Sequence, residues 1–285
     1  MMTMHPSCLF EVLIWRQAAP LAKLITGGLL SCTVLLIGSA VANADSQTIG
    51  PAEVKGLVID GLRGSIVIDV TAGDEVELVV DGDNDTLDQL ETTIDDDALR
   101  IRVPSSDTNI AVVNNQGNIS VVTSGGGRTE VQIGDQTYTS NSEPIELAVR
   151  ATVPVGTMLH LEGVVGRTEI GDTEADVVLN CASCKATLGT IAALDLNISG
   201  TGEVAVDRIE RALITEISGG GRVDIADGDV ENASVNIVGS GEVDFAGHAV
   251  DASVSIVGSG NVRIRDVDNP VQSSVIGSGD VTTGR

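Results

Sequence analysis

Aromatic rings and positive charges are scarce in this sequence. Its 285 residues include one Trp, one Tyr and two Phe, and 16 Lys and Arg stand against 41 Asp and Glu, which gives a formal net charge of -25. Sites that stack sugars or bases need aromatic platforms, and nucleic-acid binding needs a basic surface that displaces counterions. The composition therefore argues against nucleic acid as a partner. Any core must be aliphatic, and the 42% hydrophobic content is sufficient to form one.

The N-terminal segment has the features of a secretory signal. Residues 24–44 read LITGGLLSCTVLLIGSAVANA, with Lys23 before the apolar run and Ala42 and Ala44 at the small-residue positions of a cleavage site. A basic flank, an apolar run and small residues at its end are typical of signal peptides. We predict a signal peptide over residues 1–44 and an exported protein, located in the periplasm, at the outer membrane or on the cell surface. An uncleaved membrane anchor and lipidation at Cys32 are the rival interpretations.

A repeat of 19 or 20 residues organises the C-terminal half. The motif ISGTGEV at 198–204 recurs as ISGGGRV at 217–223, IVGSGEV at 237–243, IVGSGNV at 256–262 and VIGSGDV at 275–281. Self-similarity at a fixed period of this length is the signature of solenoids. Each copy places two glycines at a corner between strands, where glycine permits positive φ and close approach of neighbouring backbones. The predicted corner glycines are Gly200, Gly202, Gly219, Gly221, Gly239, Gly241, Gly258, Gly260, Gly277 and Gly279.

The residues beside each corner alternate between apolar and polar. Runs such as ASVSI at 252–256 and NVRIR at 261–265 have the period of two of a half-buried strand. A unit this short cannot bury its apolar side alone, whereas stacked units can. We therefore predict an all-β fold, a parallel β-solenoid with coils of about 19–20 residues in which like residues pile up in columns. The buried columns are Val204, Val223, Val243, Val262 and Val281, and beside them Val206, Ile225, Phe245 and Ile264.

An acidic ladder follows the corners on the solvent side. Glu203, Glu242 and Asp280 occupy the same repeat position, with Arg222 and Asn261 between them to relieve the repulsion of stacked carboxylates. The simplest interpretation is a solubilising surface ladder. The alternative is a cation-binding stripe. With the ladder interpretation we expect no cofactor, and with the stripe interpretation the expected ion is calcium.

The N-terminal half is β-rich but less regular. Alternating runs between residues 55 and 103 are separated by turn clusters, and residues 104–144 are rich in Ser, Asn, Gly and Thr. We predict β-strands over residues 45–158, with a flexible insert at 104–144 that forms a long loop or a protruding hairpin. Solenoid repeats follow over 159–285, and residues 52–283 form one continuous domain.

The chain resembles a known bacterial family. The opening strands, the Val-Pro step at 153–154 and the repeated Gly-Ser-Gly-Asp/Glu/Asn-Val units are similar to the family described as "putative auto-transporter adhesin, head GIN domain" over roughly residues 52–283. The resemblance implies an exported or envelope-located β-solenoid and brings no catalytic residues. The insert at 104–144 and a cysteine pair depart from the family pattern.

Cys181 and Cys184 form a C-x-x-C at a position where other coils carry Gly-x-Gly. A local disulfide is the expected state in an oxidising compartment, where it would stiffen that corner, and two free buried thiols are the alternative. A redox site would need a helix in a βαβ context, and a zinc site would need two further ligands, so both are less favoured. We predict no metal site.

Other candidate sites have simpler explanations. The acidic run at 81–88 lacks the Gly and Glu that an EF-hand loop requires, so we interpret it as an acidic turn. His160 alternates with leucines and is expected to face outward, and His248 follows a glycine at a predicted turn. Asp224 and Asp244 are expected to stack one coil apart, as the paired carboxylates of a polysaccharide-active β-helix enzyme do, although no aromatic or basic sugar-binding groups accompany them in the sequence pattern.

We therefore predict a non-catalytic interaction module of the bacterial envelope, with an adhesin-like or scaffold role. An envelope protein or a polysaccharide is the expected partner. The alternative is a polysaccharide-active enzyme that uses the stacked aspartates. No cap is visible after the last repeat, and exposed strand edges invite pairing, so we also expect self-association through the C-terminal edge of the solenoid or a partner that covers it.

Overall fold

The computed structural model describes residues 46–103 and 147–284, and between them the strands at 108–114, 117–123, 127–133 and 136–142. The predicted signal peptide and its cleavage site lie outside the described residues. No helix in the part of the chain that the structure describes is long and apolar enough to span a membrane.

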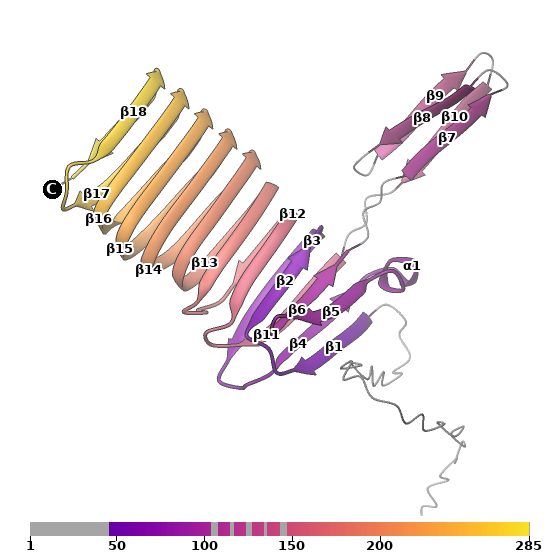
Figure 1. Ribbon diagram of the computed structural model, residues 1–285, viewed down its shortest axis with the longest axis horizontal. Coiled ribbons are helices and arrows are strands. Elements are labelled where there is room, and N and C mark those ends of the chain that lie inside the picture. Colours follow the sequence, from indigo (N-terminus) through magenta and orange to yellow (C-terminus); the bar gives the residue numbers. More distant parts are fainter. Residues whose placement is uncertain are drawn as a thin grey trace, which may run out of the picture. The chain divides into compact units, whose positions relative to one another are not determined.

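Parallel strands stack one above another through the C-terminal half (Figure 1). Each is in register with the next, so a residue of one coil lies beside the residue one repeat later. This arrangement confirms the predicted parallel β-solenoid. The strands are β12 (Met158–Ile170), β13 (Asp176–Gly200), β14 (Glu203–Gly219), β15 (Arg222–Gly239), β16 (Glu242–Gly258), β17 (Asn261–Val267), β18 (Gln272–Gly277) and β19 (Asp280–Thr283).

Each coil contains two straight runs. In β14, residues 203–209 pair with β15 without interruption, the register then shifts between Ile209 and Ala212, and residues 212–219 pair again up to the next glycine corner. We call the stretch that follows a glycine corner the post-corner run and the stretch that leads into the next corner the pre-corner run. The long strands bend between these runs, so one strand contributes to both.

The core consists of aliphatic columns, as the repeat predicted, except that Val281 in the last coil is only partly buried. Val204, Val223, Val243 and Val262 are paired in turn along four coils and are each at most 2% exposed. The neighbouring column of Val206, Ile225, Phe245 and Ile264 is equally dry. Burial of each such side chain stabilises the fold by about 1.5–3 kcal/mol.

Phe245 is the largest side chain in these columns, and glycines make room for it. A Cβ added at Gly228 would lie 2.9 Å from the ring's Cε2, and one at Gly247 would collide with the same ring. The narrow interior therefore accommodates this ring because two of the positions next to it are glycine, and an aliphatic core of this width is consistent with the scarcity of aromatic residues.

The N-terminal part adds antiparallel pairs to the parallel stack. On one side, β3 (Arg63–Thr71) pairs with β12, and then β11 (Leu147–Pro154), β4 (Val76–Asp81) and β1 (Ser46–Ala52) follow in that order. On the other, β2 (Gly56–Asp60) pairs with β12, followed by β6 (Ala98–Arg102) and β5 (Glu91–Asp95). The pairs β1–β4, β4–β11 and β5–β6 are antiparallel, whereas the solenoid pairs are parallel.

Two antiparallel hairpins lie within the predicted insert at 104–144. One joins β7 (Thr108–Asn114) to β8 (Gly117–Thr123), and the other joins β9 (Gly127–Ile133) to β10 (Gln136–Ser142). Of the two forms expected for this segment, the strands have the hairpin form.

Candidate functional site

The first glycines of the five corners form a column of their own. Gly200, Gly219, Gly239, Gly258 and Gly277 are paired in sequence, and each has positive φ. At Gly239, for which φ is +129°, an added Cβ would collide with the carbonyl oxygen of Gly219 one coil below. That same oxygen accepts a hydrogen bond from the N–H of Ser240 at 2.8 Å. Glycine is therefore required both for the backbone conformation and for the stacking distance.

The second glycines, Gly202, Gly221, Gly241, Gly260 and Gly279, accommodate a core side chain from the preceding coil. A Cβ at Gly241 would lie 2.8 Å from Cγ2 of Ile217, and one at Gly260 would lie 2.7 Å from Cγ2 of Ile237. Contacts this short are not tolerated between carbon atoms, so each corner leaves space for the isoleucine beneath it. The corner glycines consequently have a structural role that their place in the repeat explains completely.

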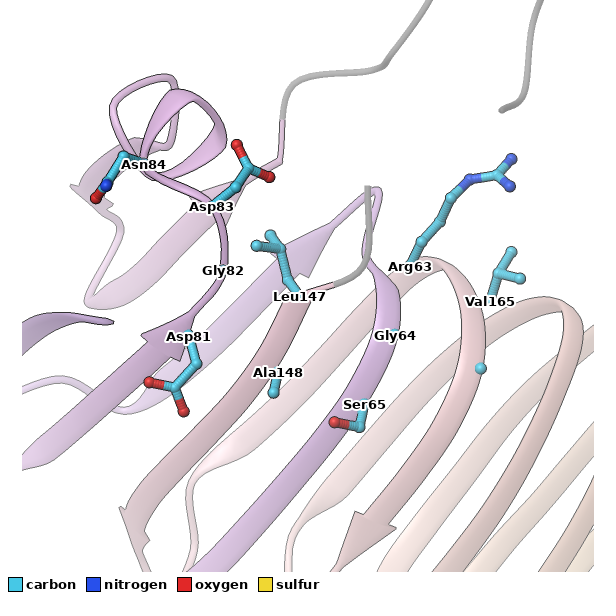
Figure 2. A pocket seen from close by; sticks show the side chains of 11 residues that line it. Arg63, Gly64, Ser65, Asp81, Gly82, Asp83, Asn84, Leu147, Ala148 and Val165 are labelled. Atoms are coloured by element: carbon cyan, nitrogen blue, oxygen red, sulfur yellow. The ribbon is translucent and has the colours of Figure 1, made fainter. Parts of the chain in front are cut away.

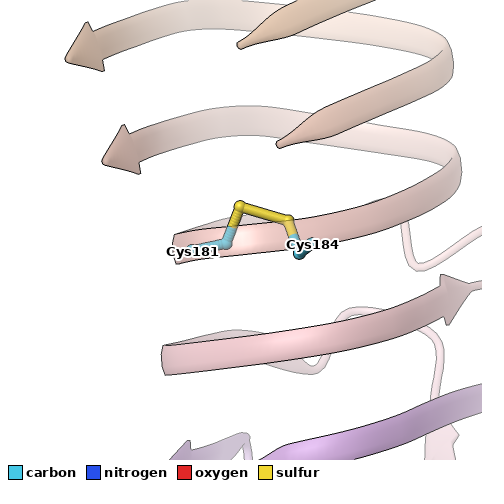
Figure 3. Close-up of a disulfide and its surroundings, with 2 residues drawn as sticks. All are labelled: Cys181 and Cys184. Atoms are coloured by element: carbon cyan, nitrogen blue, oxygen red, sulfur yellow. A yellow bond between two sulfur atoms is a disulfide. The ribbon is translucent and has the colours of Figure 1, made fainter. Parts of the chain in front are cut away.

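Cys181 and Cys184 are joined by a disulfide within one coil (Figure 3). Both residues are buried, at 3% and 6% exposed. A Cβ at Gly202 would lie 3.0 Å from Sγ of Cys181, the same relation that Gly221 has to Ile198 in the next coil. Cys181 thus occupies the inward position that isoleucine takes in later coils, and the disulfide closes this corner in place of a glycine pair.

The acidic ladder is a row of alternating charges. Glu203 pairs with Arg222, Arg222 with Glu242, Glu242 with Asn261 and Asn261 with Asp280 along the post-corner runs. Nη1 of Arg222 lies 2.6 Å from a carboxylate oxygen of Glu242, and the carboxylate of Asp280 accepts a hydrogen bond from Thr282. Sequence reasoning missed the partner of Glu203, which is Lys185 at 3.0 Å in the disulfide coil. The sequence does indicate this partner, because Lys185 directly follows Cys184 just as Glu203 directly follows Gly202, which puts both at the same position of successive coils.

The carboxylates of this row are therefore largely neutralised by the chain itself. Within the residues that the structure describes, no group of three or more His, Cys, Asp or Glu side chains is arranged to hold a metal ion. The row can contribute charged and hydrogen-bonding groups to a surface. The carboxylates of Glu203 and Glu242, however, already have cationic partners in Lys185 and Arg222.

Asp224 and Asp244 stack as predicted, and each has an arginine. Their backbones pair between β15 and β16, Arg222 binds both carboxylate oxygens of Asp224 at 2.8 and 3.0 Å, and Arg263 binds Asp244 at 3.0 Å. The expectation that no basic group accompanies these aspartates was wrong, because the arginines lie two residues away or one coil away. The hydrogen bond to Asp224 and the negative charges of Asp224 and Glu242 raise the pKa of Arg222 above its usual value.

His248 lies inside β16 rather than at a turn, which corrects the sequence prediction. Its Nδ1 is 2.9 Å from Asp229 in the preceding coil, and its Nε2 is 3.1 Å from Asp268 in the following one. The hydrogen bond to Asp229, followed by that to Asp268, raises the pKa of His248. The ring of His248 therefore links three successive coils. His160 faces outward between buried Leu159 and Leu161, as its alternation indicated.

A shallow hollow of about 990 Å³ lies among the N-terminal strands (Figure 2). Arg63 stands on one side of it, and Asp81 and Asp83 stand on the other, with Leu147 between them. Asp83 is the N-cap of a single helical turn, α1 (Asn84–Leu87), and accepts hydrogen bonds from the N–H and hydroxyl of Thr86. The acidic run at 81–88 therefore includes a capped helical turn as well as the expected acidic turn, and its capping carboxylate is already engaged.

Comparison with known proteins finds one matching family and several similar crystal structures. A family model described as "Putative auto-transporter adhesin, head GIN domain" matches residues 59–284, which confirms the resemblance carried by the repeats. A crystal structure described as "a putative adhesin" from Bacteroides fragilis is similar with 12% identity and a TM-score of 0.55, over 84% of this chain and 96% of that chain. A "putative adhesin" from Parabacteroides distasonis aligns with 17% identity and a TM-score of 0.48, over 84% and 96% of the two chains. No curated protein matches the chain.

Proposed function

Because the chain belongs to the family described as "Putative auto-transporter adhesin, head GIN domain", we propose that it acts as a non-catalytic, adhesin-like interaction module exported to the bacterial envelope. The proposal includes a periplasmic, outer-membrane or cell-surface location, which the signal-like segment at 24–44 supports. Two structurally similar crystal structures are themselves described as putative adhesins.

The observation that carries the proposal is the register of the outward side chains. Because every coil repeats the same pairing, each outward position becomes a straight column along the stack, as in Glu203, Arg222 and Glu242. Columns of this kind present a long surface of closely spaced polar groups. Extended repeat surfaces of this type bind through many modest contacts rather than through one deep pocket.

The proposed partner is an envelope protein or a polysaccharide. Polar and charged side chains of the post-corner runs supply hydrogen bonds, and the excess of acidic residues favours partners that bring their own cations or basic groups. Calcium would act here as a bridge between the protein and an acidic polymer rather than as a resident cofactor.

The enzyme alternative has weaker support. A polysaccharide hydrolase needs one carboxylic acid that donates a proton and one carboxylate that acts as base or nucleophile. The carboxylates of Asp224 and Asp244 are each engaged by an arginine, Arg222 and Arg263 respectively, so their oxygens already have hydrogen-bond partners within the chain. This pairing supports a structural and surface role for the two aspartates.

A binding experiment tests the proposal directly. The full chain, exported and purified, is incubated with intact cells, envelope fractions and a panel of acidic and neutral glycans, with and without calcium. We expect retention by at least one of these, and we expect weaker retention for the combined variant Glu203→Gln, Glu242→Gln and Asp280→Asn. Glu216→Gln is the matched control, because Glu216 is exposed on a pre-corner run.

Two results would contradict the proposal. Wild-type protein that binds none of these materials removes the interaction role. Glycan cleavage that is abolished by Asp224→Asn or Asp244→Asn would establish the enzyme alternative instead.

A further inference from the structure

The solenoid carries its charges unevenly. The outward residues of the pre-corner runs in β15, β16 and β18 are all exposed, and none is ionisable from Ser234, Ser253 and Gln272 up to each glycine corner; Asp251 lies just before this stretch in β16. We call these nine residues the charge-free strip: Ser234, Asn236, Val238, Ser253, Ser255, Val257, Gln272, Ser274 and Ile276. The matching outward positions of the post-corner runs, from Arg222 and Asp224 to Asp280 and Thr282, are charged in six cases out of eight.

One column of the charge-free strip is apolar. Val238, Val257 and Ile276 are stacked in register and are 49%, 43% and 67% exposed. The same column holds Ser199 and Ser218 in the earlier coils. Exposed aliphatic side chains therefore replace serine in the coils approaching β18, and the most exposed of them is on β18 itself.

The core is also open at β18. Val275 continues the inward column of Ile217, Ile237 and Ile256, yet it is 40% exposed whereas those three are at most 1% exposed. Among the described strands, β18 pairs with β16 alone, so its outer edge presents backbone N–H and C=O groups without a strand partner. Figure 1 shows β18 as the outermost of the stacked strands.

From these three observations we propose that β18 pairs, antiparallel, with β18 of a second copy of this chain. Identical edges satisfy each other across a two-fold axis, since the interface is then self-complementary. The pairing continues the sheet from one copy into the other, covers Val275, and joins the two charge-free strips into one. It is independent of the adhesin-like role.

Charge is the reason to choose a second copy as the occupant. The chain has a formal net charge of -25, so two copies repel wherever acidic surfaces approach. The charge-free strip and the adjoining edge of β18 let two copies meet without placing ionised side chains opposite each other. Directly opposed residues of an antiparallel pair lie on the same face, so outward Ser274 must face Gln272, Ser274 or Ile276 of the other copy.

The strength of this contact follows from its size. Two short strands and the residues beside them bury less surface than a standard permanent interface, so association is weak and depends on concentration. We expect a dissociation constant between about 1 μM and 1 mM.

Sedimentation velocity of the full chain over a concentration series tests the proposal. Wild-type protein is expected to shift from monomer to dimer. Ser274→Glu is expected to raise the dissociation constant at least about tenfold, because it places the two new carboxylates on one face of the shared sheet, directly opposite or diagonal to each other. The matched control is Ser218→Glu, which adds the same charge on an exposed pre-corner position three coils away and is expected to dimerise like the wild type. Both sites are exposed, so both variants are expected to retain the wild-type circular dichroism spectrum.

Hydrogen exchange locates the contact. Amides of residues 272–277 are expected to gain protection as the concentration rises, while those of β14 stay unchanged. The proposal is overturned if the wild type stays monomeric up to about 1 mM, if Ser218→Glu weakens the dimer as much as Ser274→Glu, or if the protection appears elsewhere.

Discussion

The glycine corner offers the sharpest test of how the coils stack. In Gly239→Ala, a methyl group is placed on a residue with φ of +129°, a region that residues with a side chain rarely occupy. Backbone strain of this kind costs about 1–3 kcal/mol. The methyl also collides with the carbonyl of Gly219, which accepts the Ser240 hydrogen bond, and loss of that bond costs about 0.5–1.5 kcal/mol.

Together these terms predict that Gly239→Ala lowers the free energy of unfolding by about 2–4 kcal/mol. For a body of this size, that corresponds to a fall in Tm of roughly 5–15 °C. Gly220→Ala is the matched control at the neighbouring corner, because its added Cβ would have no atom nearer than Thr201 Cγ2 at 4.0 Å. It is expected to stay within about 0.5 kcal/mol of the wild type. Equal Tm values for the two variants in thermal unfolding followed by circular dichroism would refute the argument that stacking requires positive φ.

Three further predictions concern Thr215, His248 and the disulfide between Cys181 and Cys184. The hydroxyl of buried Thr215 has no hydrogen-bond partner among the described residues. Thr215→Val is therefore expected to raise the free energy of unfolding in urea by about 1–2 kcal/mol, and Thr215→Ser is expected to lower it. A valine variant less stable than the wild type would contradict this. Because the folded-state pKa of His248 is raised, its contribution to stability is complete below the unfolded pKa of about 6.5 and is lost as the pH rises through the folded value. The Tm difference between wild type and His248→Ala should therefore shrink from pH 6 to about pH 9, and a constant difference would disprove the charged bridge. The disulfide closes a loop of only four residues, so reduction by a thiol is expected to lower the free energy of unfolding by about 2 kcal/mol, and an unchanged urea midpoint would show that it adds nothing.

The core columns could be predicted because the repeat fixes their register. A slip of one residue would turn Val223, Val243 and Val262 toward water, so the alternation and the spacing of the corners together admit one arrangement. The same logic placed Asp224 beside Asp244. The ion pairs of these residues could not be read from the repeat, because Lys185, Arg222 and Arg263 reach their partners with long side chains whose direction depends on neighbouring coils.

The order of the N-terminal strands could not be predicted for a different reason. β11 lies between β3 and β4, although residues 104–144 separate it from both in sequence. Local alternation identifies each strand but carries no information about which distant strand it joins. The disulfide coil was located only approximately, since Cys181 replaces an isoleucine and its inward position is shown by contact with Gly202 rather than by the motif.

Stacking in register brings like charges close together, and the two runs of each coil avoid the resulting repulsion in different ways. Any charged residue repeated at one position is placed beside its own kind at about 4.8 Å, where like charges repel. The post-corner runs keep their charges. In one column the sign alternates, as Lys185, Glu203, Arg222 and Glu242 show. In the next column, stacked Asp224 and Asp244 each bind an arginine. The charge-free strip of the last pre-corner runs has no charged side chain. A row of charged side chains stays hydrated, because removing water from charges costs a large free energy. An uncharged row costs less free energy to dehydrate when another surface covers it. The charge-free strip, which lies beside the open edge of β18, is therefore the surface expected where the solenoid contacts another copy of itself.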